Sequence, residues 1–121
     1  MSKYSGPTDL YIGGEWRSAN SGETISSVDP ASEEEYATVQ KADESDVDDA
    51  VQAAAAAAER SSEWRTMDPD VRREHVRGMA DAIEAMKDEL TLVESHDNGK
   101  TPFEAGLEID MVIDTFRYYA G

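Results

Sequence analysis

The residues best suited to chemistry stand in one stretch, His96-Asp97-Asn98-Gly99-Lys100-Thr101-Pro102. Asp97 falls in the predicted last turn of a helix, where a carboxylate meets the negative end of the helix dipole at a cost of roughly 0.3–1 kcal/mol. A positive charge is therefore expected beside it. An ion pair with Lys100 meets this expectation, and so does a hard monovalent cation held by oxygen ligands, so the residues alone leave both interpretations open.

Other reaction chemistries find little support in the residue types. The chain has no cysteine, which excludes disulfides, thiolate metal sites and a cysteine nucleophile among these 121 residues. Its two histidines are interpreted as structural, His75 on a helix surface and His96 in a last helical turn. The 27 acidic residues offer many carboxylate pairs, which are interpreted as a solvated surface. We therefore expect no catalytic residue within this chain.

Charge limits the classes of partner that fit the chain. A formal net charge of -16, from 27 acidic and 11 basic residues, argues against nucleic acid and anionic membranes. Only four of the basic residues are lysines, a balance typical of halophilic proteins, whose charges are screened over about 3 Å in molar salt. Val, Ile, Leu and Phe number only 19, which leaves disorder, or marginal folding at low salt, as alternatives.

The first forty residues predict a disordered tail over residues 1–8 and then a small β-meander. Gly13-Gly14 supplies the positive φ angles of a tight hairpin turn between two short strands. Two further β-rich runs follow, one of them ended by Asp29-Pro30. The expected strands are residues 10–12, 15–17, 24–28 and 36–39.

Helical signals fill the remainder of the chain and predict three helices. The first begins at a Ser45 cap and contains a run of six alanines. The second begins at Asp68-Pro69 and carries one apolar seam over nearly 30 residues, about 45 Å. An intramolecular core explains this seam better than a coiled coil does. The third runs from Pro102 to at least Ala120, with Thr101 and Glu104 as a capping box.

The order of elements indicates an α+β fold without a dinucleotide-binding sheet. Strands do not alternate with helices, and Gly13-Gly14 opens no helix that could bind a phosphate. No apolar run approaches the roughly 20 residues that span a membrane, and the first residues lack a signal-peptide pattern, so we expect a cytoplasmic protein. Because Tyr118-Tyr119 stand in the last turn of the third helix, we expect residues 9–121 to be a fragment of a longer domain.

Four motifs resemble, in this order, the start of NAD(P)-dependent aldehyde dehydrogenases. They are Tyr11-Ile12-Gly13-Gly14-Glu15-Trp16, Val28-Asp29-Pro30-Ala31, Asp97-Asn98-Gly99-Lys100-Thr101-Pro102 and Phe116-Arg117-Tyr118-Tyr119-Ala120-Gly121. The resemblance covers residues 9 to 121 and implies the N-terminal part of that family's cofactor-binding domain, without its Rossmann sheet.

The resemblance also implies a reaction that this chain cannot complete. Such enzymes oxidise an aldehyde to a carboxylic acid: a cysteine thiolate attacks the carbonyl carbon, hydride passes to NAD⁺ or NADP⁺, and a glutamate-activated water hydrolyses the thioester. All these parts lie downstream in the family. The chain is therefore expected to be inactive alone, with an aldehyde, the remainder of the polypeptide and a homo-oligomer as the partners of the complete enzyme.

Four positions in the chain match functional positions of the family. Family members bind a monovalent cation, K⁺ or Na⁺, through two backbone carbonyls and an aspartate, which correspond to Ser27, Val28 and Asp97. The turn here is Asp29-Pro30 where the family has Asn-Pro. Met111 matches a position that lines the substrate tunnel in several members. The pattern of aminoaldehyde-oxidising members is not kept at Leu107, Glu108 and Met111. We therefore expect a less cationic aldehyde as the substrate.

An alternative of a different class stays open at the level of sequence. The chain could be a non-catalytic, acidic helical interaction module, which predicts a cooperative melt and a defined oligomer in high salt. An enzyme fragment predicts instead that helix faces meant for the missing part are exposed.

Overall fold

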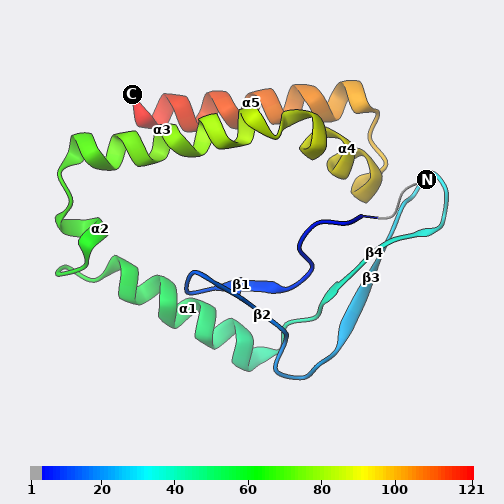
Figure 1. Ribbon diagram of the computed structural model, residues 1–121, viewed down its shortest axis with the longest axis horizontal. Helices are drawn as coiled ribbons and strands as arrows, with labels where there is room; N and C mark the ends of the chain where they lie inside the picture. Colours follow the sequence, from blue (N-terminus) through cyan, green and yellow to red (C-terminus); the bar gives the residue numbers. More distant parts are fainter. Residues whose placement is uncertain (1–3) are drawn as a thin grey trace. The chain divides into compact units, whose positions relative to one another are not determined.

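The computed structural model describes residues 4–121 and confirms the α+β class (Figure 1). Two compact units have their own internal packing: the described residues up to Val28 with Glu34–Thr66, and Asp29–Glu33 with Met67–Gly121. The elements in chain order are β1 (Leu10–Ile12), β2 (Glu15–Arg17), β3 (Thr24–Val28), β4 (Glu35–Gln40), α1 (Glu44–Ala58), α2 (Glu63–Thr66), α3 (Pro69–Ala85), α4 (Lys87–Asn98) and α5 (Pro102–Ala120).

The strands of the first unit form two separate antiparallel pairs, β1–β2 and β3–β4, instead of one continuous meander. Gly13 and Gly14 adopt φ angles of 63° and 88°, as the hairpin prediction requires. The loop after β2 is held by side chains instead of a strand ladder: Ala19 N–H donates to Gln40 Oε1 at 2.9 Å, and Asn20 N–H donates to both Asp46 carboxylate oxygens at 3.2 Å. This anchoring explains why β2 and β3 do not pair.

The predicted tail over residues 1–8 stays a prediction. Its first three residues lie outside the described residues. Among the others, Tyr4 N–H donates to the Tyr36 carbonyl at 3.1 Å, and the Thr8 carbonyl accepts from Gln40 N–H at 3.0 Å.

Helix α1 begins two residues earlier than a Ser45 cap would place it. Asp43 is the N-cap: its side chain accepts from Asp46 N–H, and the Asp46 side chain accepts from Asp43 N–H in return. Ser45 lies inside the helix and donates to Asp43 Oδ1 at 2.7 Å. The reciprocal pair satisfies two backbone donors, so it fixes the helix start in preference to the serine.

Asp46 is fully buried and joins α1 to the end of β2. Arg17 Nη2 donates to Asp46 Oδ1 at 2.9 Å and to Asp49 Oδ2 at 2.8 Å. These two carboxylates raise the pKa of Arg17, with the Asp49 hydrogen bond as the first cause. A buried carboxylate with a cation and several N–H donors around it is a structural anchor of the first unit.

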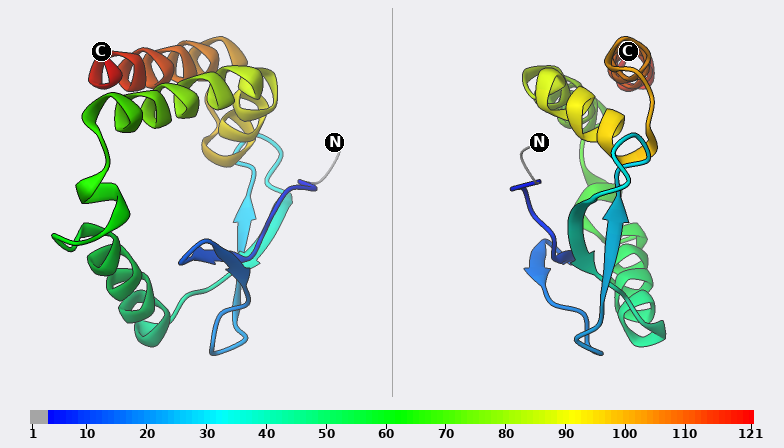
Figure 2. Two further views of the ribbon diagram at one scale, coloured as in Figure 1. Left: turned by 60° about the vertical axis from the view of Figure 1, so that its left-hand side comes forward. Right: turned by 90° about the vertical axis from the view of Figure 1, so that its right-hand side faces the viewer.

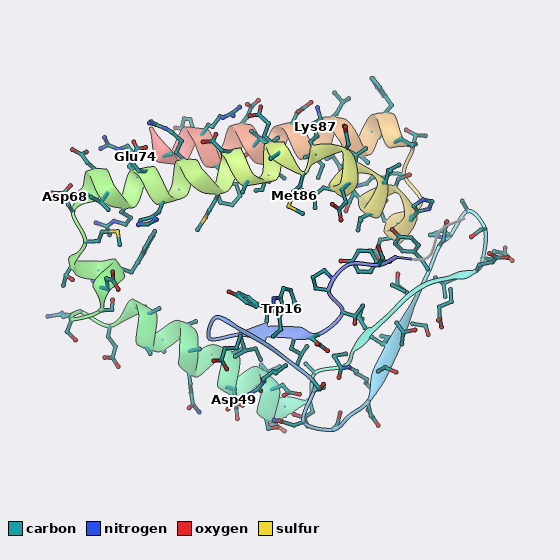
Figure 3. The ribbon with its side chains drawn as sticks, in the orientation of Figure 1. Trp16, Asp49, Asp68, Glu74, Met86 and Lys87 are labelled. Carbon is teal, nitrogen blue, oxygen red and sulfur yellow. The ribbon has the colours of Figure 1, made fainter. Side chains whose placement is uncertain are left out.

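In the second unit, the single long helix predicted after Asp68-Pro69 is two helices. The chain breaks at Met86, which has φ -104° and ψ 9°, and Figure 3 shows Met86 and Lys87 on opposite sides of the chain at this point. Lys87 Nζ reaches Asp110 on α5 at 2.6 Å. A straight helix of about 45 Å would overhang α5, which is about 28 Å long, so the break lets both halves pack against α5.

Helices α3 and α5 lie side by side and run in opposite directions (Figure 2). The buried apolar residues of these two helices are Ala80 of α3 and Ala105, Ile113 and Ala120 of α5. Arg117 flanks this contact and pairs with Glu84 at 2.7 Å and Asp81 at 3.5 Å. Within residues 4–121, none of the helices has the length and apolar character needed to cross a membrane.

Candidate functional site

The stretch from His96 to Pro102, here called the junction, connects α4 to α5 and has the geometry that its sequence predicts. Gly99 ends α4 in the left-handed conformation, with φ 80°, and its N–H donates to the Ser95 carbonyl at 2.9 Å. Thr101 caps α5 and forms the predicted capping box with Glu104. Ser95 Oγ donates to the Lys100 carbonyl at 2.6 Å, which holds the turn between the two helices.

Gly99 is required at the junction for a second reason. A Cβ atom at this position would lie 3.2 Å from Cβ and 3.3 Å from Cγ of Pro30. The junction therefore packs directly against the turn that Asp29-Pro30 begins. Both the positive φ angle and this close approach exclude a larger residue without local strain.

Asp29 fixes that turn and pairs with His96. One oxygen, Oδ1, accepts from Ala31 N–H at 2.8 Å, and the other, Oδ2, lies 3.0 Å from His96 Nδ1. The carboxylate is only 2% exposed. The hydrogen bond with His96, followed by that with Ala31 N–H, lowers the pKa of Asp29. The side chain is therefore held as a carboxylate that ties the turn to the end of α4.

Lys100 is engaged by carboxylates of both helices. Its Nζ pairs with Glu94 of α4 at 3.2 Å and with Glu108 of α5. These bonds raise the pKa of Lys100, with Glu108 as the first cause. The cation thus neutralises two carboxylates on neighbouring helices, while Asp97 lies exposed on α4.

The three residues predicted to ligate a monovalent cation fall in different parts of the chain. Ser27 and Val28 end β3 in the first unit, where a β-bulge between them disturbs the pairing with β4, whereas Asp97 belongs to the second unit. Neither unit alone contains all three. Among the described residues, no three His, Asp or Glu side chains are placed to hold a metal ion. The assignment of this site stays a prediction.

Met111 lies on α5 and is 67% exposed. It lines a hollow of about 450 Å³ together with Asp114, Thr115, Tyr118 and Tyr119. All five residues come from the last turns of α5, so the hollow is open on one side of a single helix. The predicted role of Met111 in a substrate tunnel stays a prediction.

The starts of the four longer helices, α1, α3, α4 and α5, do not fit a dinucleotide. The first turns of α1, α3 and α5 are occupied by the side chains of Asp43, Asp68 and Thr101, which accept from the free N–H groups there. Helix α4 has no side-chain cap, but Asp88 and Glu89 stand in its first turn. Acidic groups at these positions repel a pyrophosphate.

Comparison with known proteins shows to which family this chain belongs. A model of the aldehyde dehydrogenase family matches residues 16–121. The chain belongs to the aldehyde dehydrogenase family. Retinal dehydrogenase 2 of Homo sapiens is 40% identical over 116 residues, which cover 94% of this chain and 22% of that protein. Mitochondrial aldehyde dehydrogenase of Homo sapiens is 40% identical over 114 residues, which cover 93% and 22%.

A solved structure shows the same fold. Betaine aldehyde dehydrogenase of Staphylococcus aureus, determined in complex with NAD⁺, superposes with a TM-score of 0.88 at 32% identity. The match covers 94% of this chain and 22% of the other, and it lies in the N-terminal part of the aldehyde dehydrogenase fold. This family member therefore spans between a fifth and a quarter of the length of the relatives that it matches.

Sequence reasoning missed the pairing of Asp29 with His96. The two residues are 67 positions apart, so no local periodicity connects them. The one available signal was the departure from Asn-Pro to Asp29-Pro30, because an added carboxylate in a turn requires a partner when it is buried.

Proposed function

We propose that this chain is the N-terminal part of an enzyme that oxidises an aldehyde to a carboxylic acid with NAD⁺ or NADP⁺ as hydride acceptor. The observation that carries the proposal is the family match over residues 16–121, together with about 40% identity to two human aldehyde dehydrogenases. In the complete reaction, one aldehyde, one water and one oxidised nicotinamide give a carboxylate, a reduced nicotinamide and two protons.

Alone, the chain is catalytically incomplete. It has no cysteine to serve as a thiolate nucleophile. At the starts of α1, α3 and α4, side-chain caps or acidic residues in the first turn disfavour the binding of a pyrophosphate. The nucleophile and the cofactor site then belong to the remainder of the enzyme. What the chain contributes is a scaffold of α3, α4 and α5 that is fixed by the junction and by the Asp29–His96 pair.

The finer features of the complete enzyme follow from the family resemblance. Ser27 and Val28, through their backbone carbonyls, and Asp97 would help to hold a K⁺ or Na⁺ ion. Met111 would line the path of the aldehyde. We further propose a cytoplasmic homo-oligomer that works at high salt, in keeping with a net charge of -16.

A reconstitution experiment tests the proposed activity. The probe is the S. aureus betaine aldehyde dehydrogenase shortened by the segment that matches this chain. The reaction is reduction of NAD⁺, measured with betaine aldehyde and, in parallel, with an uncharged aliphatic aldehyde. Neither polypeptide alone should turn over, and the co-expressed pair should. Turnover by this chain alone would refute its incompleteness, and an assembled but inactive pair would refute the proposed function.

A further inference from the structure

The buried side of α5 leaves room for small rotations of the helix about its axis. Its buried side chains are Ala105, Ile113 and Ala120, and Ala80 is the buried residue of α3. At about 100° per residue, the three positions on α5 fall within an arc of about 80°, here called the buried arc. An alanine side chain ends at Cβ, so alanine contacts oppose a small rotation less than interlocking large side chains do. The groups at the edges of the buried arc therefore help to set the rotation of α5.

Ion pairs bind α5 beyond both edges of the buried arc. On one side, Lys87 Nζ donates to both carboxylate oxygens of Asp110, at 2.6 and 2.7 Å. Arg117, seven residues after Asp110 and on the same side of the helix, pairs with a carboxylate of α3 at 2.7 Å. On the other side, Lys100 pairs with Glu108. Asp110 and Glu108 each lie about 60° beyond opposite edges of the arc, so their bonds oppose rotation in opposite directions.

Lys87 reaches Asp110 because the chain breaks at Met86. It is the first residue of α4 and lies on the side of the chain that α5 occupies (Figure 3). It also acts on the neighbouring pair of Arg117 and Glu84. The hydrogen bond with Arg117 is the first cause that lowers the pKa of Glu84, the charge of Lys87 lowers it further, and that of Asp110 raises it. The groups that bind this side of α5 therefore form one connected network.

The rotation of α5 decides where Met111 points. Met111 follows Asp110 directly, is 67% exposed and lies on the side of α5 opposite the buried arc. Side-chain tips lie about 5–6 Å from a helix axis, so a turn of about 40° displaces them by about 4 Å. We propose that Lys87 is a positioning residue for the aldehyde: through Asp110 it fixes the rotation of α5 and, with it, the direction of Met111. This inference rests on the proposed function, in which Met111 lines the path of the aldehyde.

Loss of the Lys87–Asp110 pair should affect substrate binding more than folding. The two side chains are 36% and 49% exposed, and an ion pair of this exposure contributes little to stability. A displaced Met111 changes an apolar contact, and one methylene group in such a contact changes kcat/KM by roughly 10–200-fold. We therefore expect the KM for the aldehyde to rise roughly tenfold, with the KM for NAD⁺ unchanged.

Steady-state kinetics of this chain assembled with the shortened S. aureus enzyme measure the effect. Lys87→Met removes the charge and leaves an unbranched side chain, whereas Lys87→Arg keeps the charge. Arg77→Met is the matched control, because the ion pair that it removes, between Arg77 and Glu74 at 3.0 Å, is also exposed and lies within α3 alone. The substrate is the uncharged aliphatic aldehyde, on which the lost charge has no direct electrostatic effect.

Spin-label distances in the 121-residue chain test the rotation without turnover, because the native chain has no cysteine. The labels are attached to Met111→Cys on α5 and to Asp70→Cys on α3, whose native side chain is 80% exposed. Double electron–electron resonance measures the distance between them. Lys87→Met should shift or broaden this distance by up to about 4 Å, and Lys87→Arg and Arg77→Met should leave it unchanged.

A rise in the aldehyde KM with Lys87→Met, absent with Lys87→Arg and with Arg77→Met, would support the positioning role. An unchanged aldehyde KM or an unchanged spin-label distance would overturn it. A similar rise in the KM for NAD⁺ would also overturn it, because a general loss of assembly then explains the effect. Absence of turnover in the unsubstituted pair would count against the proposed function instead, and the spin-label distance would then decide whether Lys87 fixes the rotation of α5.

Discussion

Replacing Gly99 by alanine should destabilise the second unit more than the same change at a matched glycine. Gly99 has φ 80°, and its added Cβ would lie 3.2 Å from Pro30 Cβ. Gly22 has φ 70°, and nothing lies within 4 Å of its added Cβ. The pair therefore separates the cost of the backbone conformation from the cost of the contact with Pro30.

The expected magnitudes follow from these two geometries. The left-handed conformation costs a non-glycine residue about 1–2 kcal/mol, and the loss of glycine's freedom in the unfolded chain returns about 0.4–1 kcal/mol. Gly22→Ala should thus cost about 1 kcal/mol. Gly99→Ala should cost about 1 kcal/mol more, because the Pro30 ring or the junction must move by a few tenths of an ångström.

Urea unfolding in molar KCl, followed by far-UV circular dichroism, measures both costs as changes in the free energy of unfolding. The high salt screens the net charge of -16. If Gly99→Ala were no more destabilising than Gly22→Ala, the close packing of the junction against the Asp29-Pro30 turn would be refuted.

Three further predictions concern the anchors of each unit. Asp46→Ala should lower the free energy of unfolding by about 3 kcal/mol, because Arg17 and the Asn20 and Asp43 N–H groups lose the buried carboxylate that accepts from them. The exposed Asp48→Ala should change it by less than about 0.5 kcal/mol, and equal effects in urea unfolding would contradict the anchoring role. Ile113→Ala removes a side chain that is 2% exposed and should lower the free energy of unfolding by about 2–5 kcal/mol. Val112→Ala, at 41% exposure, should lower it by less than about 1 kcal/mol. The reverse order in thermal melts would contradict the burial of the Ile113 side of α5. Hydrogen bonds from Ser45 and from Asp46 N–H lower the pKa of Asp43, so its contribution to stability is present above about pH 4 and is lost as the pH falls further. Asp43→Asn, which keeps the cap but does not titrate, should make the acid loss of α1 helicity shallower, and an unchanged acid transition would count against the Asp43 cap.

Local signals predicted those parts of the fold that local chemistry decides. Gly13-Gly14 requires positive φ angles, and Thr101 with Glu104 satisfies the first N–H groups of α5, so the hairpin and the last helix were confirmed. The start of α1 was misplaced because both Ser45 and Asp43 are competent caps. The reciprocal bonds between Asp43 and Asp46 decided between them, and the spacing of three residues is a local capping-box signal that the sequence already carries.

The parts that could not be predicted depend on contacts between distant residues. The apolar seam through Met86 is continuous in sequence, but α5 is too short to cover one straight helix, so the chain breaks there. The Asp29–His96 pair joins residues 67 positions apart. The assignment of Ser27, Val28 and Asp97 to a cation site came from the family resemblance and stays a prediction.

The most direct test of the proposed function is the rate of NAD⁺ reduction by this chain assembled with the shortened S. aureus enzyme, measured with betaine aldehyde and with an uncharged aliphatic aldehyde. Turnover in the assembled pair, with none in either polypeptide alone, is the predicted result. An assembled pair without turnover would contradict the proposal that this chain is a working part of an aldehyde-oxidising enzyme.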